Sequence, residues 1–171
     1  KNIYLKNGIS LTLESTIILN ETKYYQVSTD FSNSVTSELV SKGLADRVNL
    51  FFINTGPSLL DFGISAGIPG SQKKVGNYNG VLIFLLSHAT GSNLNDQLLA
   101  ETAGHEMGHF LGLFHTREKF LAFDPINDTP ECPYISAVNC TKYGSDNLMF
   151  HEPWSGGNQD NLTDGQVYVL K

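Results

Sequence analysis

The sequence predicts an α+β fold in which a sheet packs on one long helix. Three features of the 171-residue chain indicate this fold: strand-length apolar runs mix with a short helix in the front half, one long helical segment follows, and the back half is mostly irregular. The mixture of strands and helices makes the front half α/β in type. We expect one domain over residues 1–171, with an upper part of about 1–112 and a lower part of about 113–171.

Strand signals come first along the chain. Loose alternation of apolar and polar residues predicts strands at 3–14 and 22–29. An apolar run predicts a buried strand within 47–56, and another run predicts a strand at 80–87. The glycine-rich stretch 63–80 between them predicts a long loop.

Helix signals occur in three places. Residues 32–45 predict a short helix. Residues 93–115 predict a long helix capped near Asn95 or Asp96, because these side chains can accept hydrogen bonds from the first turn. A last helix is expected to begin at Thr163 and to run to the end of the sequence. The apolar stripe of the long helix consists of Leu99, Ala103, Met107 and Phe110.

The charge balance and the length of the apolar runs argue against two kinds of partner. The net charge of −6 disfavours nucleic acid and anionic membranes. The longest apolar run, residues 81–86, is far shorter than the roughly 20 residues of a membrane-spanning helix. We therefore expect no nucleic-acid partner and no membrane span, and we expect a monomer.

The two cysteines, Cys132 and Cys140, lie close together in a polar stretch. A disulfide between them would fit an oxidising compartment, and two free thiols would fit the cytosol. The polar Asn-, Ser- and Thr-rich loops, together with the first possibility, favour a secreted or otherwise extracytoplasmic protein.

Three of the five histidines lie within eleven positions. On a helix, His105 and His109 lie about 40° apart around the axis and about 6 Å apart along it, so both rings can bind one ion. If the helix continued, His115 would lie about 15 Å further along the axis than His105. Gly112 can end the helix, because glycine tolerates the left-handed conformation of a helix C-terminus. The spacing therefore predicts a turn that returns His115 to the other two.

Three neutral imidazoles suit zinc and leave a fourth position for water. Glu106 follows His105 directly, so it lies at the edge of the metal site and can act as a general base toward that water. A lone histidine is more often a core residue than a ligand, but the complete string of histidines, glutamate and glycine makes a structural role improbable. Met149 is either a core gap-filler or a structural residue beneath the metal.

The string H-E-x-x-H-x-x-G-x-x-H at 105–115 resembles the zinc motif of the metzincin endopeptidases. Within that clan the chain is most similar to the pappalysin branch, over residues 47–171. The segments that carry the resemblance are "RVNLFFIN", "SAGIPGS", "NGVLIFL", "HEMGHFLGLFHT", "DPINDTPEC", "DNLMF" and "LTDGQVYVL".

The resemblance implies a metzincin-like fold. A twisted sheet would pack on the active-site helix, and an irregular lower half would carry the Met-turn at Met149 and a C-terminal helix. The strand at 81–86 would be the edge strand that pairs with an extended substrate. The substrate-binding residues would be Val81, Leu82, Ile83 and Phe84 on that strand, with Pro153 and Trp154 after the Met-turn.

The resemblance also implies further site residues. The Asp-Thr-Pro loop would hold calcium through Asp124, Asn127 and Thr129, although ordinary turn chemistry explains the same residue types. The family also has cysteines near this loop, and this resemblance favours a disulfide between Cys132 and Cys140. The family places a tyrosine two residues after the Met-turn methionine. Here His151 stands there. Either it donates a similar hydrogen bond to the tetrahedral intermediate, or this role is empty.

The expected function is therefore zinc-dependent hydrolysis of peptide bonds in protein or peptide substrates, with Glu106 activating the water. One alternative is a zinc-containing binding or adhesion module with little or no peptidase activity, which the histidine at position 151 motivates. A metal-dependent hydrolase of other substrates has less support.

Overall fold

The computed structural model describes residues 3–54, 61–71, 79–118, 122–134, 137–140, 142–153 and 157–171. Helices and strands mix along the chain, which confirms the predicted α+β class. The α-helices are α1 (Ser34–Val40), α2 (Asp96–Phe110) and α3 (Asp164–Leu170). The strands are β1 (Leu50–Ile53), β2 (Gly63–Ser65), β3 (Val81–Phe84), β4 (Ala89–Thr90) and β5 (Asn93–Leu94). The short 3₁₀ helices are η1 (Leu5–Asn7), η2 (Thr22–Gln26), η3 (Leu85–His88) and η5 (Ala137–Cys140).

The described strands form a three-stranded sheet in the order β1-β3-β2 and a small β4-β5 hairpin. β1 runs parallel to β3, with Leu50 opposite Val81, and β2 runs antiparallel to β3, with Ile64 opposite Leu82. All four residues of β3 are fully buried, because the side chains on both faces of this central strand pack in the core with residues of α1 and α2.

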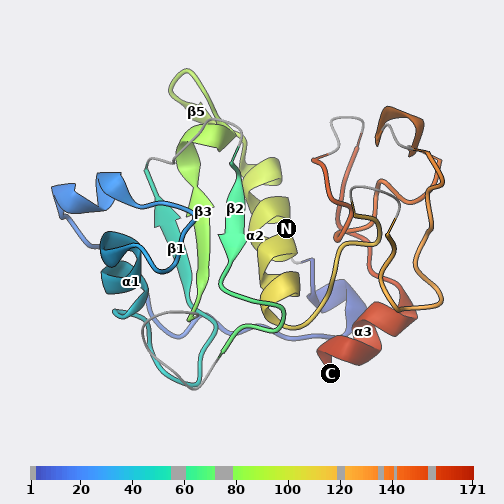
Figure 1. The fold of residues 1–171 in the computed structure, drawn as a ribbon, viewed down its shortest axis with the longest axis horizontal. Helices are drawn as coiled ribbons and strands as arrows, with labels where there is room; N and C mark the ends of the chain where they lie inside the picture. The colour runs from blue at the N-terminus through green and yellow to red at the C-terminus, as the bar shows by residue number, and fades with distance from the viewer. Residues whose placement is uncertain are drawn as a thin grey trace.

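The sheet lies between α1 on one side and α2 on the other (Figure 1). α1 begins at Asn33, whose side chain accepts hydrogen bonds from the Val35 and Thr36 amides. α2 contacts β2 and β3 directly. The buried upper core consists of Tyr24, Val27, Phe31, Leu39, Val40, Ile53, Ala66, Val81, Leu82, Ile83, Phe84 and Phe110.

The two strands predicted at 3–14 and 22–29 are wrong. The structure has the 3₁₀ helices η1 and η2 there, joined by a segment without regular structure. Alternation of apolar and polar residues determines only which face of a sheet each side chain would occupy. A strand also needs a neighbouring strand that pairs with its backbone. Without one, Leu11 and Leu13 remain 48% and 83% exposed.

Two expectations near β1 need correction. The strand within 47–56 is present as β1, but only its last residue, Ile53, is buried, since Leu50 is 38% and Phe52 is 51% exposed. The segment predicted as one long loop contains β2, whose three residues pair with β3. The backbone of β2 finds this partner only in the folded chain, so glycine content alone suggested a loop.

The segment between α2 and α3 lies on the far side of α2 from the sheet (Figure 1). Apart from η5 and two isolated β-bridges, its described residues form no regular element. Cys132 and Cys140 form a disulfide within it. α3 begins at the predicted Thr163, which forms a capping box with Gln166.

A second buried core joins the two ends of the chain behind α2. Its residues are Ile3, Tyr4, Met107, Leu113, Leu148 and Met149. The Tyr4 hydroxyl donates a hydrogen bond of 2.7 Å to the Gly104 carbonyl of α2. The first described residues of the chain therefore pack with the lower part. Among the described helices, none has both the length and the apolar character needed to cross a membrane.

Candidate metal centre

Helix α2 presents two of the three histidines. Its N-terminus is fixed by Asn95, whose side chain accepts a hydrogen bond from the Leu98 amide. Along the helix, the His105 and His109 rings meet edge to face, with centroids 4.7 Å apart. The four-residue spacing thus brings the two rings together as predicted.

The helix ends so that the chain turns back toward these rings. Gly112 has a φ of 114°, and its amide donates to the His109 carbonyl. The Leu113 amide donates to the Gly108 carbonyl, so the two bonds form a Schellman motif. The turn predicted at Gly112 is present, and it returns His115 to α2.

The three histidines converge through one nitrogen each. The Nε2 atom of His115 lies 3.1 Å from Nε2 of His105 and 3.0 Å from Nε2 of His109. Among the described residues, these three form the one group of His, Cys, Asp or Glu side chains with metal-binding geometry. Tetrahedral zinc with nitrogen ligands would place such atoms about 3.3 Å apart, so the spacing fits a zinc ion.

The other nitrogen of each ring has its own acceptor. Nδ1 of His105 donates to the Leu148 carbonyl at 2.6 Å, and Nδ1 of His109 donates to the Leu113 carbonyl at 2.7 Å. Nδ1 of His115 donates to the Glu118 carboxylate at 2.8 Å. A neutral ring that donates through Nδ1 has a lone pair on Nε2. When all three rings are neutral, three lone pairs face one point, which is the arrangement that a cation requires.

Burial keeps the first two rings neutral. Desolvation, followed by the neighbouring histidines, places the pKa of His105 well below its usual range. Desolvation and the His115 ring lower the pKa of His109 to about 4. Both residues are therefore in the metal-binding form at neutral pH.

The side chain of Glu106 projects from α2 toward β2. A Cβ atom on Gly63 would lie 2.8 Å from Cγ of Glu106, so the absence of a side chain in β2 makes room for this carboxylate. Burial raises the pKa of Glu106 to about 7, and a hydrogen bond from the Ser65 amide acts in the opposite direction. Such a carboxylate is basic enough to accept a proton near neutral pH.

Met149 is fully buried against α2. Its Sδ would lie 2.6 Å from a Cβ atom on Gly108, so glycine at that position allows the close contact. The Met149 amide donates to Asn147, whose side chain exchanges hydrogen bonds of 2.8 and 3.1 Å with Gln166 of α3. A buried amide pair therefore holds the methionine turn.

His151 lies beside the triad, with its ring centroid 6.3 Å from that of His115. Its side chain is 8% exposed, and Nη1 of Arg117 lies 3.3 Å from its Nε2. Nδ1 is buried and has no hydrogen-bond partner among the described residues. Arg117, whose guanidinium also donates to the Tyr134 carbonyl, therefore holds the ring that was expected to contact substrate.

Glu118 and Arg117 are absent from the sequence-based site. Glu118 follows the zinc motif by three residues and offers a carboxylate near its last histidine, which was a usable signal. Nothing in the local sequence marks Arg117, because its partners His151 and Tyr134 come from distant loops.

The edge position expected for the strand at 81–86 is wrong. Val81, Leu82, Ile83 and Phe84 form β3, which is paired on both sides and fully buried. A central strand has no free backbone groups for a peptide. Among the described strands, β1 and β2 are the edges, and β2 is the one in contact with α2. Of the other two residues, Pro153 is exposed and Trp154 lies outside the described residues.

The Asp-Thr-Pro loop carries local turn contacts. One carboxylate oxygen of Asp124 accepts hydrogen bonds from the Ile126 amide and the Thr129 hydroxyl. The other oxygen, Oδ2, is buried without a hydrogen-bond partner among the described residues. Asn127 is exposed. Turn chemistry accounts for the first oxygen, and a cation would account for the second.

The comparisons with known proteins point to the same chemistry. No family model matches the chain. An extracellular metalloprotease from Colletotrichum graminicola is 29% identical over 106 residues, which cover 60% of this chain and 37% of that protein. The chain thus spans little more than a third of the length of that relative. A distant similarity to a metalloprotease and a three-histidine group agree on a metal-dependent site.

Proposed function

We propose that this chain is a zinc-dependent endopeptidase of the metzincin type, closest to the pappalysin branch. One observation carries the proposal: the Nε2 atoms of His105, His109 and His115 face one point while every Nδ1 donates elsewhere. A satisfied core histidine has no reason to direct its lone pair at two others. The similarity to an extracellular metalloprotease supports the same class.

Zinc at this point would polarise the scissile carbonyl and lower the pKa of a bound water. The protein residues then have separate tasks. Glu106, with its pKa raised by burial, accepts the proton of the attacking water and returns it to the leaving amine. Glu118 and the Leu113 and Leu148 carbonyls hold the histidine rings in their binding orientation.

The substrate is an extended peptide or protein segment that pairs with β2. This strand is the described edge beside the site, because the Ser65 amide reaches Glu106 and Gly63 lies against its side chain. Backbone pairing there would place a peptide bond over the histidines. Exposed Pro153 contributes to the pocket beyond the scissile bond.

The disulfide and the extracellular relative support a secreted or extracytoplasmic location. We also propose that the chain acts as a monomer and a single domain, with the boundary of its two parts near residue 112. Calcium binding at Asp124, Asn127 and Thr129 remains part of the proposal, supported by the buried Oδ2 of Asp124.

A binding or adhesion module is the second candidate. It is favoured by one contact: Arg117 occupies Nε2 of His151, the nitrogen that would otherwise be available to a tetrahedral intermediate. The intact Glu106 argues against it, since a purely structural site has no use for a base.

Peptide cleavage distinguishes the two candidates. Purified, zinc-loaded protein is incubated with a diverse peptide mixture, and the products are identified by mass spectrometry. We expect cuts that disappear in Glu106→Ala, which should lose at least about 100-fold in rate as general bases do. Folded, zinc-loaded protein that makes no cuts would support the binding module, and cuts that persist in Glu106→Ala would exclude this mechanism.

A further inference from the structure

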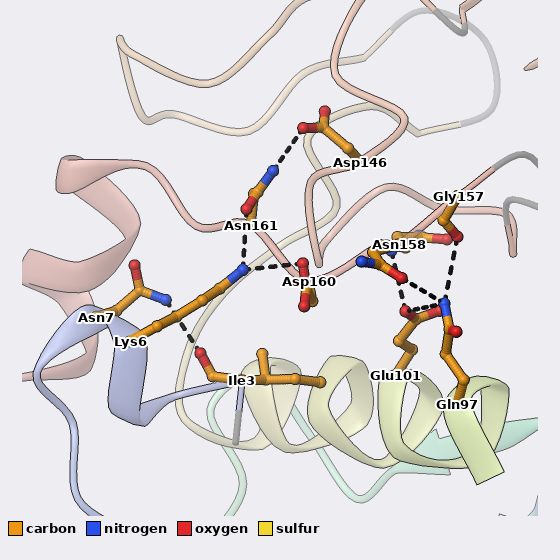
Figure 2. Close-up of polar contacts among 11 residues, drawn as sticks. Ile3, Lys6, Asn7, Gln97, Glu101, Asp146, Gly157, Asn158, Asp160 and Asn161 are labelled. Carbon is orange, nitrogen blue, oxygen red and sulfur yellow. Dashed lines mark hydrogen bonds and ion pairs between the residues drawn. The ribbon is translucent and has the colours of Figure 1, made fainter. Parts of the chain in front are cut away.

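Glu101 is a carboxylate buried in α2, one helical turn before His105. It is 7% exposed. Its Oε1 accepts a hydrogen bond of 3.1 Å from the Gln159 amide and another of 3.1 Å from the Gln97 side chain. Figure 2 shows Glu101 and Gln97 rising from the helix toward the segment that carries Asn158. Burial of a carboxylate costs free energy unless N–H donors surround it. The two hydrogen bonds to Oε1 therefore offset the desolvation of Glu101.

Gln159 carries the connection onward to the methionine turn. Its side chain is buried, and Nε2 donates a hydrogen bond of 2.8 Å to the Phe150 carbonyl. That carbonyl belongs to the peptide group that joins Phe150 to His151. Two hydrogen bonds therefore link a carboxylate of α2 to the backbone directly after Met149.

The same segment also fixes the acceptor of a histidine. The Leu148 amide donates to the Asn161 carbonyl at 2.7 Å, and the Leu148 carbonyl accepts from Nδ1 of His105. Lys6 holds the segment from the other side through Asp160 at 2.8 Å and Asn161 at 2.9 Å (Figure 2). Residues 159–161 thus lie as a brace between α2 and the methionine turn.

We propose that Glu101 and Gln159 are positioning residues that set the separation between α2 and the methionine turn, and so hold His105 in its metal-binding orientation. This inference rests on the proposed zinc function. Without the brace, the Leu148 carbonyl would no longer be fixed opposite Nδ1 of His105, and the ring would lose its preferred orientation.

Zinc affinity tests the proposal without reference to peptide cleavage. Zinc dissociation constants are measured by competition with a coloured chelator, on proteins whose folding is verified by circular dichroism. We expect Glu101→Leu to weaken zinc binding by about tenfold, the lower end of the range for partners of metal ligands. Glu101→Gln keeps an acceptor oxygen for the Gln159 amide and should bind zinc nearly as the parent does.

Two further variants separate positioning from general stability. Gln159→Leu keeps the backbone bond to Glu101 but loses the bond to Phe150, and we expect the same loss of zinc affinity. The double variant Glu101→Leu/Gln159→Leu should be no weaker than either single variant, since both interrupt one connection. Gln97→Ala is the matched control: it removes the exposed donor to Glu101 and leaves the connection to Phe150 intact.

The outcomes are distinct. Folded Glu101→Leu and Gln159→Leu proteins that bind zinc as tightly as the parent would overturn the inference. If Glu101→Leu does not fold, Gln159→Leu alone decides between the same two results. Failure of the parent itself to bind zinc would instead contradict the proposed function.

Discussion

Each histidine of the triad has two ring nitrogens, and the partner of Nδ1 decides which nitrogen can bind a metal. Two of the three partners are backbone carbonyls, and the third is the Glu118 carboxylate. A carboxylate differs from a carbonyl because its negative charge also offsets the charge of a divalent cation. His115 is therefore the histidine whose affinity for a metal depends on one side chain, that of Glu118.

Replacement of Glu118 should weaken metal binding. We expect Glu118→Ala to lower zinc affinity by about 10–100-fold, and Glu118→Gln to lower it less because the amide oxygen still accepts from Nδ1. Chelator competition on the folded proteins measures both values. The exposed Glu131→Gln serves as the control and should bind zinc as the parent does. Equal affinities for Glu118→Ala and the parent would show that Glu118 has no role toward His115.

Glu106 gives a pH-dependent stability with a defined sign. Its pKa in the folded protein, about 7, lies above the reference value of 4.5. The carboxyl therefore stabilises the fold fully below pH 4.5 and loses that contribution as the pH rises through about 7. In metal-free protein, Glu106→Gln should gain about 1–2 kcal/mol of unfolding free energy relative to the parent between pH 4.5 and pH 8, a value discounted for partial exposure.

Urea denaturation in the presence of a chelator, at both pH values, measures this difference. The Gln variant isolates Glu106, because the buried histidines titrate alike in both proteins. A difference that is independent of pH, or that has the opposite sign, would mean that the carboxylate is not buried in the metal-free protein.

At the scale of elements, the end of α2 determines whether three histidines meet. Phe110 ends the helix, and the Schellman motif around Gly112 redirects the chain within two residues. The methionine turn approaches from the other side, where Met149 packs at Gly108. Two short turns, neither of them a regular element, therefore determine how closely the segments after α2 approach the histidines of this helix.

Gly112→Ala should disturb both the turn and the metal site. At a φ of 114°, alanine costs about 1–3 kcal/mol of strain, which should appear as a lower unfolding free energy. Relief of that strain would shift His115 and weaken zinc binding. Gly91→Ala is a matched control, since Gly91 also has a positive φ, of 62°, and has open space around it in the β4-β5 hairpin.

Denaturant unfolding and zinc affinity are measured on both variants. We expect both to lose stability and only Gly112→Ala to lose zinc affinity. If both variants bind zinc as the parent does, the return of His115 does not depend on the glycine.

At the scale of the whole molecule, α2 is shared by two cores. The upper core packs the sheet and α1 around Phe110, and the lower core packs Met107 with Leu148 and Met149. Ile3 and Tyr4 complete the lower core, so the first described residues stabilise the part of the molecule that is last in sequence. Ligands bound on either side of α2 should therefore stabilise the whole fold.

Thermal unfolding with added metals tests the two proposed sites separately. A zinc concentration of 100 times its dissociation constant should stabilise the protein by about 2.7 kcal/mol. His109→Ala should abolish the stabilisation by zinc but keep any stabilisation by calcium. Asp124→Asn should abolish the stabilisation by calcium but keep the stabilisation by zinc. Calcium that raises the melting temperature of the parent and of Asp124→Asn equally would leave turn chemistry as the explanation of that loop.

Local signals explain what could be predicted. The cap at Asn95, the four-residue histidine spacing, the turn at Gly112 and the start of α3 at Thr163 each depend on a few neighbouring residues. Helix periodicity, capping and positive φ are properties of short segments, so the sequence by itself determined α2, the convergence of the histidines and the position of Glu106 beside them.

Contacts between distant residues decided the rest. Only the folded sheet makes β3 central and places β1 and β2 at its edges, because strand order follows from which backbones pair and not from apolar content. Only the tertiary structure joins Arg117 to His151 and Glu101 to Gln159, since these partners are separated by loops without a local pattern. The sequence therefore determined the metal-binding chemistry, and the tertiary structure decided which strand borders the site and which side chains hold it in place.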